Sequence, residues 1–237
     1  MAEDNPIQVN FGRPFPLFPF PLASAILLPQ QVMPLHIFEP RYVQMVQEAL
    51  DAAGQFAMAV FSGSGWKENY HGRPALRRAV CIGQIVRHEK LPEDKFNILV
   101  QGVCRARIVR ETPSKAGQLY RAAILEAVGI DEEAEQKLYG VRERLTELLT
   151  EDPLSRLSHA EWMVERIKDE DIPTAVILEL ASFALPTARE VRYRLLAEPD
   201  AGERAGLIET ELLSLQRLIR VAGAQHPEAW PKGCSWN

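Results

Sequence analysis

The sequence predicts an α+β protein in two parts, a mostly antiparallel β-barrel with one inserted helix followed by an α-helical bundle. Before residue 130, short runs rich in Val, Ile and Phe alternate with Gly and Pro, which is typical of antiparallel strands. After it, apolar residues recur at helical spacing. The net charge divides at the same place, +3 over residues 1–130 and −8 over 131–220. We therefore expect an N-terminal extension over 1–13, a barrel subdomain over 14–130, a helical subdomain over 131–222 and an irregular tail over 223–237.

The first half is expected to hold five strand-forming runs and one helix. The runs cover residues 24–28, 55–61, 79–89, 96–110 and 120–127. The fourth run reads as two strands that bend or bulge at Gly102, since a glycine inside a strand often marks such a site. The helix opens at Glu39-Pro40, carries an apolar stripe from Tyr42 to Leu50 and stops at Gly54.

The second half is expected to hold five helices. The first has leucines and valine at helical spacing over 138–149 and ends at Asp152-Pro153. Residues 175–185 are apolar almost all round, which predicts the central buried helix of the bundle. The other helix starts carry capping boxes, in which Glu follows Ser, Thr or Asp after three residues: Ser158 with Glu161, Thr187 with Glu190, and Asp200 with Glu203.

No motif for catalysis, cofactor binding or metal binding stands out, so we expect no catalytic residues, no cofactor and no metal. Phosphate-binding glycine loops, the GxSxG nucleophile elbow and paired histidines are missing from the sequence. The three cysteines, Cys81, Cys104 and Cys234, have no CxxC spacing, which favours a reducing cytosol. The acidic N-terminus resembles no signal peptide, and no apolar run is long enough to cross a bilayer. We expect a cytoplasmic protein without a membrane partner.

Three segments carry a resemblance to a known family. Residues 34–42 read PLHIFEPRY, after an opening FPLFPFPL over 15–22; residues 80–85 read VCIGQI, and 98–108 read ILVQGVCRARI. Over about residues 14–220 the chain resembles the N-terminal, substrate-binding domain of the ATP-dependent Lon proteases. Leu28 and Gln30 stand where the family has Phe and Gly, a local change in the first turn.

The resemblance implies a PUA-like β-barrel attached to a helical bundle, in a stand-alone member of the family. The ATPase and protease modules of full Lon proteases have no counterpart in this sequence. A substrate-recognition role without unfolding or proteolysis is therefore implied, with unfolded or apolar protein segments as partners and a separate ATPase or protease as a further partner.

The segment over 34–42 also has a purely structural interpretation, which we favour. Pro29, Pro34 and Pro40 fix backbone angles and set turns. Glu39 precedes a helix start, where its charge suits the helix dipole, and Arg41 is expected to pair with it or with a nearby carbonyl.

For the peptide-binding hypothesis, the candidate contact segment is the loop over 62–74. It carries Trp66 and Tyr70, and Phe61 lies just before it. Aromatic anchors of this kind dominate many protein interfaces. The alternative is that these aromatics fold back as a lid on the barrel.

The alternative function is RNA binding by a PUA-like barrel. Its candidate residues are the arginines of the first half, above all Arg77, Arg78, Arg105 and Arg107. The net charge of −5 and the scarcity of lysine clusters argue against a nucleic-acid partner. Arginines that alternate along strands are more often a solvated face or partners for acidic helices than an RNA-binding surface. An enzyme whose site assembles from distant residues is a third hypothesis that no motif supports.

Overall fold

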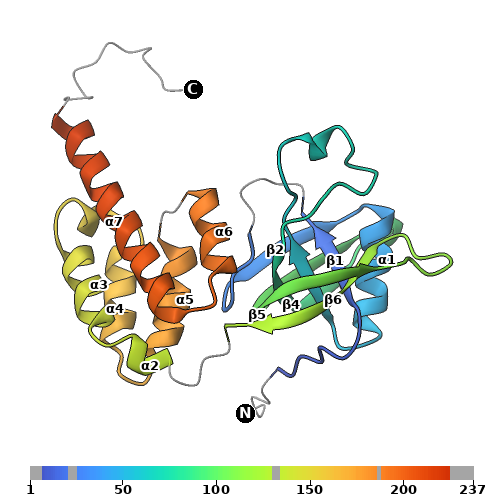
Figure 1. Ribbon diagram of the computed structural model, residues 1–237, viewed down its shortest axis with the longest axis horizontal. Coiled ribbons are helices and arrows are strands. Elements are labelled where there is room, and N and C mark those ends of the chain that lie inside the picture. The colour runs from blue at the N-terminus through green and yellow to red at the C-terminus, as the bar shows by residue number, and fades with distance from the viewer. Residues whose placement is uncertain (1–6, 21–25, 130–133, 186–187, 225–237) are drawn as a thin grey trace. The chain divides into compact units, whose positions relative to one another are not determined.

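The computed structural model describes residues 7–20, 26–129, 134–185 and 188–224 (Figure 1). Backbone contacts divide the described chain into two compact units. The first comprises Met1–Asp131 with Ala188–Asp200, and the second Glu132–Thr187 with Ala201–Asn237. We describe each unit by itself.

The first unit is a mixed six-stranded sheet with two α-helices and two short 3-10 helices. In chain order its elements are β1 (Phe15–Pro19), β2 (Val32–Ile37), α1 (Pro40–Leu50), β3 (Gln55–Ala59), η1 (Gly65–Lys67), β4 (Ala79–Lys90), η2 (Pro92–Asp94), β5 (Phe96–Thr112), β6 (Arg121–Val128) and α6 (Arg189–Ala197). The strand order is β2-β5-β4-β3-β1-β6, and β6 pairs with β5 as well as β1. Only β1 and β3 run parallel among the described strands. The α+β class, the mostly antiparallel pairing and the inserted helix are confirmed.

The sheet is not the fully closed barrel that the sequence predicts. Because β6 pairs with both β1 and β5, the sheet curls round, but β2 lies outside this curl and pairs with β5 alone among the described strands. Pro34 lies in the middle of β2. A proline, which has no N–H to donate, is tolerated in an edge strand.

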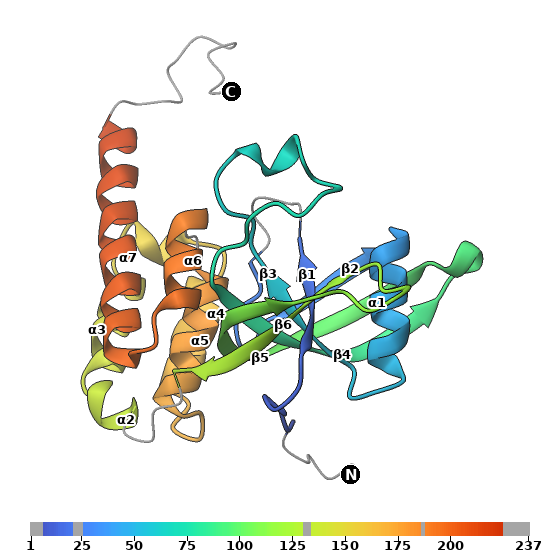
Figure 2. The same ribbon diagram turned by 45° about the vertical axis from the view of Figure 1, so that its right-hand side comes forward.

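Apolar side chains fill both sides of β1. Phe15 and Leu17 belong to the core inside the curled sheet, with small and branched residues of the other strands. Phe18 points the other way and meets the Tyr42 ring of α1 edge-on, with ring centroids 4.4 Å apart. α1 covers that side of the sheet (Figure 2) through its buried stripe, Tyr42, Met45, Val46 and Ala49. This packing fixes α1 firmly against β1 and β3.

The sequence prediction missed β1 and β2 and placed a strand over 24–28 instead. Residues 24 and 25 lie outside the described residues, and 26–28 form a buried connection without strand pairing. Prolines in β1 and β2 hide their strand character, because proline inside a run argues against a central strand.

The predicted irregularity at Gly102 is confirmed, but the run predicted as two strands forms the single strand β5. The register of β4 with β5 shifts between Ile82 and Gly83, where Gly83 faces Gly102. A Cβ atom on Gly102 would lie 2.0 Å from the carbonyl oxygen of Leu28, so only glycine fits there.

Helix α6, which the sequence assigns to the helical half, packs with the sheet instead. The Tyr193 hydroxyl accepts a hydrogen bond of 2.9 Å from the backbone N–H of Ala79, at the start of β4. The buried Arg105 of β5 donates to the carbonyl of Leu195 over 3.0 Å. These contacts assign α6 to the first unit.

The second unit is helical. It contains α2 (Ala134–Lys137), α3 (Val141–Thr150), η3 (Leu154–Arg156), α4 (Ala160–Lys168), α5 (Thr174–Ala184) and α7 (Ala201–Ala224). α5 contacts α2, α4 and α7, as expected for the central helix. Leucine and methionine side chains from several helices make the core, including Leu145, Leu149, Met163, Leu178 and Leu212. Arg204 of α7 and Glu179 of α5 form a largely buried ion pair at 3.4 Å.

The capping box predicted at Ser158 is wrong. His159 is the residue at the start of α4, no side chain caps the helix, and the Ser158 hydroxyl is 3.1 Å from the His159 ring nitrogen Nδ1. Thr187 lies outside the described residues.

Candidate functional site

Helix α1 holds the loop over 62–74 in place through the residues of the motif at its start. The Tyr70 hydroxyl donates to Glu39 Oε1, and Arg41 Nε donates to Glu39 Oε2 over 3.0 Å. The Arg41 guanidinium also donates to the Tyr70 carbonyl over 3.3 Å. Its central carbon lies 4.6 Å from the centre of the Tyr42 ring and 4.5 Å from that of Tyr70. Both partners expected for Arg41, the carboxylate and a carbonyl, are present.

The tyrosines of this cluster are hydrogen-bond donors. Burial raises the pKa of Tyr42, whose hydroxyl donates to the Pro19 carbonyl over 3.0 Å. Burial, followed by the hydrogen bond to Glu39, raises the pKa of Tyr70. Both phenols therefore stay protonated at neutral pH, and each ties a different segment to α1.

A second loop, over 113–120, is attached to the same helix further along. The Gln44 side chain donates to the Gly117 carbonyl over 3.0 Å and accepts from the Leu119 N–H over 2.8 Å. The Tyr120 hydroxyl donates to Glu48. Side chains at α1 thus hold both loops in position by hydrogen bonds.

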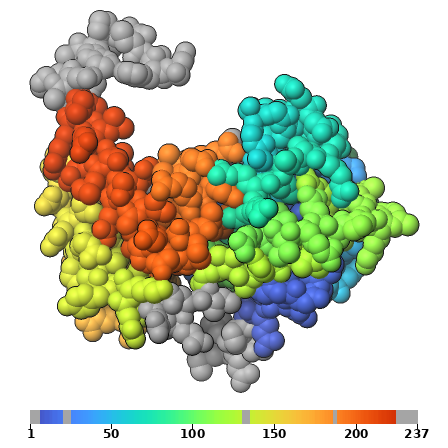
Figure 3. All heavy atoms as spheres, in the orientation of Figure 1, coloured from blue at the N-terminus to red at the C-terminus, as the bar shows by residue number. Residues whose placement is uncertain are grey.

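The structure brings the three predicted peptide-contact residues together. The rings of Phe61 and Trp66 stack at a centroid distance of 4.6 Å and an angle of 8°. Tyr70 meets both rings edge-on at 6.0 Å. Phe61 is buried, whereas Trp66 and Tyr70 are half-buried. The loop that carries them bulges from the surface of the first unit, in teal (Figure 3). The aromatics do fold back on one another, and two of them still line an open surface.

That surface is a groove of about 680 Å³, which we call the aromatic groove. Phe38, Trp66 and Tyr70 supply its apolar wall, and polar side chains surround them: Glu39, Lys67, Glu68, Asn69 and His71, with Gly72. Phe38 is 60% exposed, which is unusual for a phenylalanine. Sequence reasoning missed it because it lies inside the apolar motif. The alternation along β2, where residues 32, 34 and 36 point outward, places Phe38 on the exposed face.

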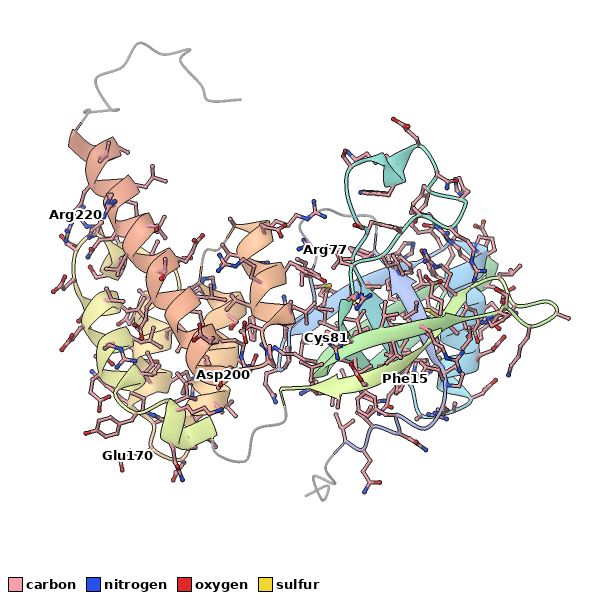
Figure 4. All side chains as sticks on the ribbon, viewed as in Figure 1. Phe15, Arg77, Cys81, Glu170, Asp200 and Arg220 are labelled. Carbon is pink, nitrogen blue, oxygen red and sulfur yellow. The ribbon has the colours of Figure 1, made fainter. Side chains whose placement is uncertain are left out.

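The arginines of the RNA hypothesis do not form an open basic face. Arg77, labelled in Figure 4, makes two hydrogen bonds to Glu190, of 2.8 and 2.6 Å, and lies over the Tyr193 ring. Arg105 is buried against α6, and Arg107 pairs with Glu126. Arg78 is exposed. Most of these side chains therefore connect strands to α6 or to each other.

The remaining reactive groups show no constellation for chemistry in the described part of the chain. Burial raises the pKa of the Cys104 thiol to about 11. Cys81, also labelled in Figure 4, is buried in β4. No set of three His, Cys, Asp or Glu side chains among the described residues could hold a metal ion. No described helix is long and apolar enough to span a membrane.

Comparison with known proteins matches this chain to one family. The family described as the ATP-dependent protease La (Lon) substrate-binding domain matches residues 16–214. A Lon protease of Desulfatibacillum aliphaticivorans is 27% identical over 145 residues, which cover 59% of this chain and 17% of that protein. The chain thus spans under a fifth of that relative.

Two solved structures share the fold. The N-terminal domain of a Mycobacterium avium complex Lon protease gives a TM-score of 0.61 at 14% identity, covering 84% of this chain and 98% of its own. A Lon N-terminal domain protein from Xanthomonas campestris gives 0.56 at 19% identity, covering 88% and 98%. Since the family match spans most of the sequence, the chain belongs to the family of Lon substrate-binding domains.

Proposed function

We propose that the protein is a non-catalytic module that binds apolar segments of other polypeptides in the aromatic groove. The observation that carries the proposal is the exposed Phe38 ring, which lines the same groove as Trp66 and Tyr70. An exposed phenylalanine beside two half-buried aromatics leaves apolar surface in water, and a ligand that covers it gains the hydrophobic free energy of burial.

The rim of the groove suits a peptide ligand. Glu39, Lys67 and Glu68 bring both signs of charge to its edge, and Asn69 offers an amide. An apolar centre with a polar rim is the usual anatomy of a protein-binding surface. The groove is also preorganised, because α1 fixes the loop through Glu39 and Arg41.

The wider role rests on the family. Its description as a substrate-binding domain supports binding of protein substrates. We propose that this chain delivers its ligands to a separate ATPase or protease in the cytoplasm.

Binding can be measured by fluorescence anisotropy with a labelled, unstructured peptide that contains Leu and Phe. We expect saturable binding, and Phe38→Ala should weaken it roughly tenfold, the effect of losing an aromatic anchor worth more than 1 kcal/mol. Val109→Ala is the matched control, because Val109 is 54% exposed but does not line the groove. Absence of saturable binding up to high micromolar concentration, or equal losses in both variants, would refute the proposal.

A further inference from the structure

A smaller pocket adjoins the aromatic groove, between the loops over 62–74 and 113–120. It has a volume of about 210 Å³ and shares His71 and Gly72 with the groove. We call it the arginine pocket, because three arginines line it: Arg41, Arg73 and Arg121. A volume of this size holds a small polar group with a few waters.

The pocket presents hydrogen-bond donors and no carboxylate. Besides the arginines, its lining includes the Ser114 hydroxyl but no Asp or Glu. Tyr120 also lines it, with its hydroxyl donated to Glu48. A guanidinium is always charged, and its planar fork fits the two oxygens of a carboxylate. The chemistry of the lining therefore suits an anionic group.

Two of the arginines are held rigidly from outside the pocket. Arg121, 12% exposed, is bound by the Glu111 carboxylate through two of its nitrogens, and its Nη1 donates to the Pro74 carbonyl over 2.7 Å. Arg41 is held by Glu39 and the Tyr70 carbonyl. Since neither Glu111 nor Glu39 lines the pocket, each leaves its arginine at the wall in a fixed orientation.

Arg73 is the arginine that remains available. It is exposed, no ion pair to a carboxylate forms among the described residues, and its one hydrogen bond is a long one of 3.3 Å to the Ser114 hydroxyl. An acidic ligand could accept hydrogen bonds from both Arg73 and Ser114, which face each other from the two loops. A charge-assisted hydrogen bond is about twice as strong as a neutral one.

We propose that the arginine pocket binds a carboxylate of the polypeptide whose apolar side chains occupy the aromatic groove. This inference rests on the proposed function, and it makes the substrate class more specific: segments in which an acidic group or the chain's own C-terminus lies next to apolar residues. His71 and Gly72 line both sites, so we expect one short segment that passes these residues to reach both.

The test compares three versions of one apolar peptide in the anisotropy assay at physiological salt. The first has a free C-terminal carboxylate, the second a C-terminal amide, and the third an amide with Asp as its last residue. We expect the first or third to bind roughly tenfold more tightly than the second, and whichever does so identifies the source of the carboxylate.

Variants assign the effect to the pocket. Arg73→Ala should remove the preference for the carboxylate and leave binding of the amide peptide unchanged. Arg110→Ala is the matched control, since Arg110 is an exposed arginine that does not line the pocket. Equal affinity for all three peptides overturns the carboxylate site while the groove proposal stands. A preference that survives in Arg73→Ala overturns its assignment to this pocket, and no binding of any peptide overturns the proposed function itself.

Discussion

Replacing Arg41 by methionine tests whether helix α1 holds the binding loop in place. Methionine keeps an unbranched apolar side chain but removes the guanidinium. The variant loses the hydrogen bonds to the Glu39 carboxylate and the Tyr70 carbonyl, together with the stacking on two tyrosine rings. Arg41 is 21% exposed, so solvent screens part of this interaction. Only the hydrogen bond to the Tyr70 carbonyl and the stacking on the Tyr70 ring reach the loop. From about 1 kcal/mol for this hydrogen bond and about half that for the ring, we expect a loss of about 1–1.5 kcal/mol in the stability of the loop.

Hydrogen exchange measures this loss at the loop itself. The amides of Ser62 and Gly72 are hydrogen-bonded to the Ala75 and Asn69 carbonyls, each over 2.9 Å, so they report on opening of the loop. A loss of about 1–1.5 kcal/mol corresponds to exchange faster by roughly 5- to 10-fold. We also expect weaker peptide binding, because the ligand must then order the loop.

Arg87→Met is the matched control for this variant. Arg87 is an exposed arginine of β4 that contacts neither loop by any hydrogen bond in the described structure. Exchange at Ser62 and Gly72 within twofold of the parent protein would show that Arg41 does not hold the loop in place. In that case the stack of Phe61 on Trp66 would hold the loop without α1.

Two further predictions concern the framework of the first unit. Gly102→Ala should destabilise this unit by about 2–3 kcal/mol in urea unfolding, because the new Cβ atom would meet the Leu28 carbonyl at 2.0 Å. The control, Gly65→Ala, has nothing within 4 Å of its Cβ atom and should change stability by less than about 0.5 kcal/mol. Equal effects of the two substitutions would show that the close contact at Gly102 does not limit stability. The hydrogen bonds from Arg77 lower the pKa of Glu190 below its ordinary value of 4.5, so its carboxylate stabilises the fold above that pH and loses this contribution as the pH falls through the lowered pKa. Urea midpoints measured from pH 7 to pH 3 should therefore fall more steeply in the parent than in Glu190→Gln, and parallel curves would show that the ion pair adds nothing.

The hydrophobic pattern correctly predicted those elements whose own residues determine whether they form a helix or a strand. The alternation and length of the runs over 79–89 and 96–110 predicted β4 and β5, and the apolar run over 175–185 predicted the central helix α5. The pattern failed to predict β1 and β2, because their prolines lack the backbone N–H that other strand residues donate. Their pairing is supplied by partners far along the chain, Ala122 for Pro16 and Leu99 for Pro34, which local sequence does not reveal.

The arginines of the first half show the same limit at the level of function. Their spacing along the strands favours a solvated face or internal pairing, but it does not identify the partners. The partner of Arg77 is Glu190, 113 residues away, on a helix whose sequence reads as part of the bundle. The contact of α6 with β4 and β5 distinguishes the two interpretations. Because of it, Arg77 binds side chains of α6 and is not part of an open basic surface.

The motif at the start of α1 combines two roles that binding data alone would confuse. Glu39 and Arg41 position the loop, whereas Phe38, their neighbour in sequence, offers its ring to the groove. Substitutions at all three positions should weaken peptide binding. A substitution at Phe38 should do so without changing loop exchange, since the ring makes no hydrogen bond to the loop, whereas substitutions at Glu39 or Arg41 should change both. Faster loop exchange in Phe38→Ala would mean that the Phe38 ring helps to hold the loop in place. The ring would then not be free to contact a ligand, and the proposed function would lose the residue on which it depends.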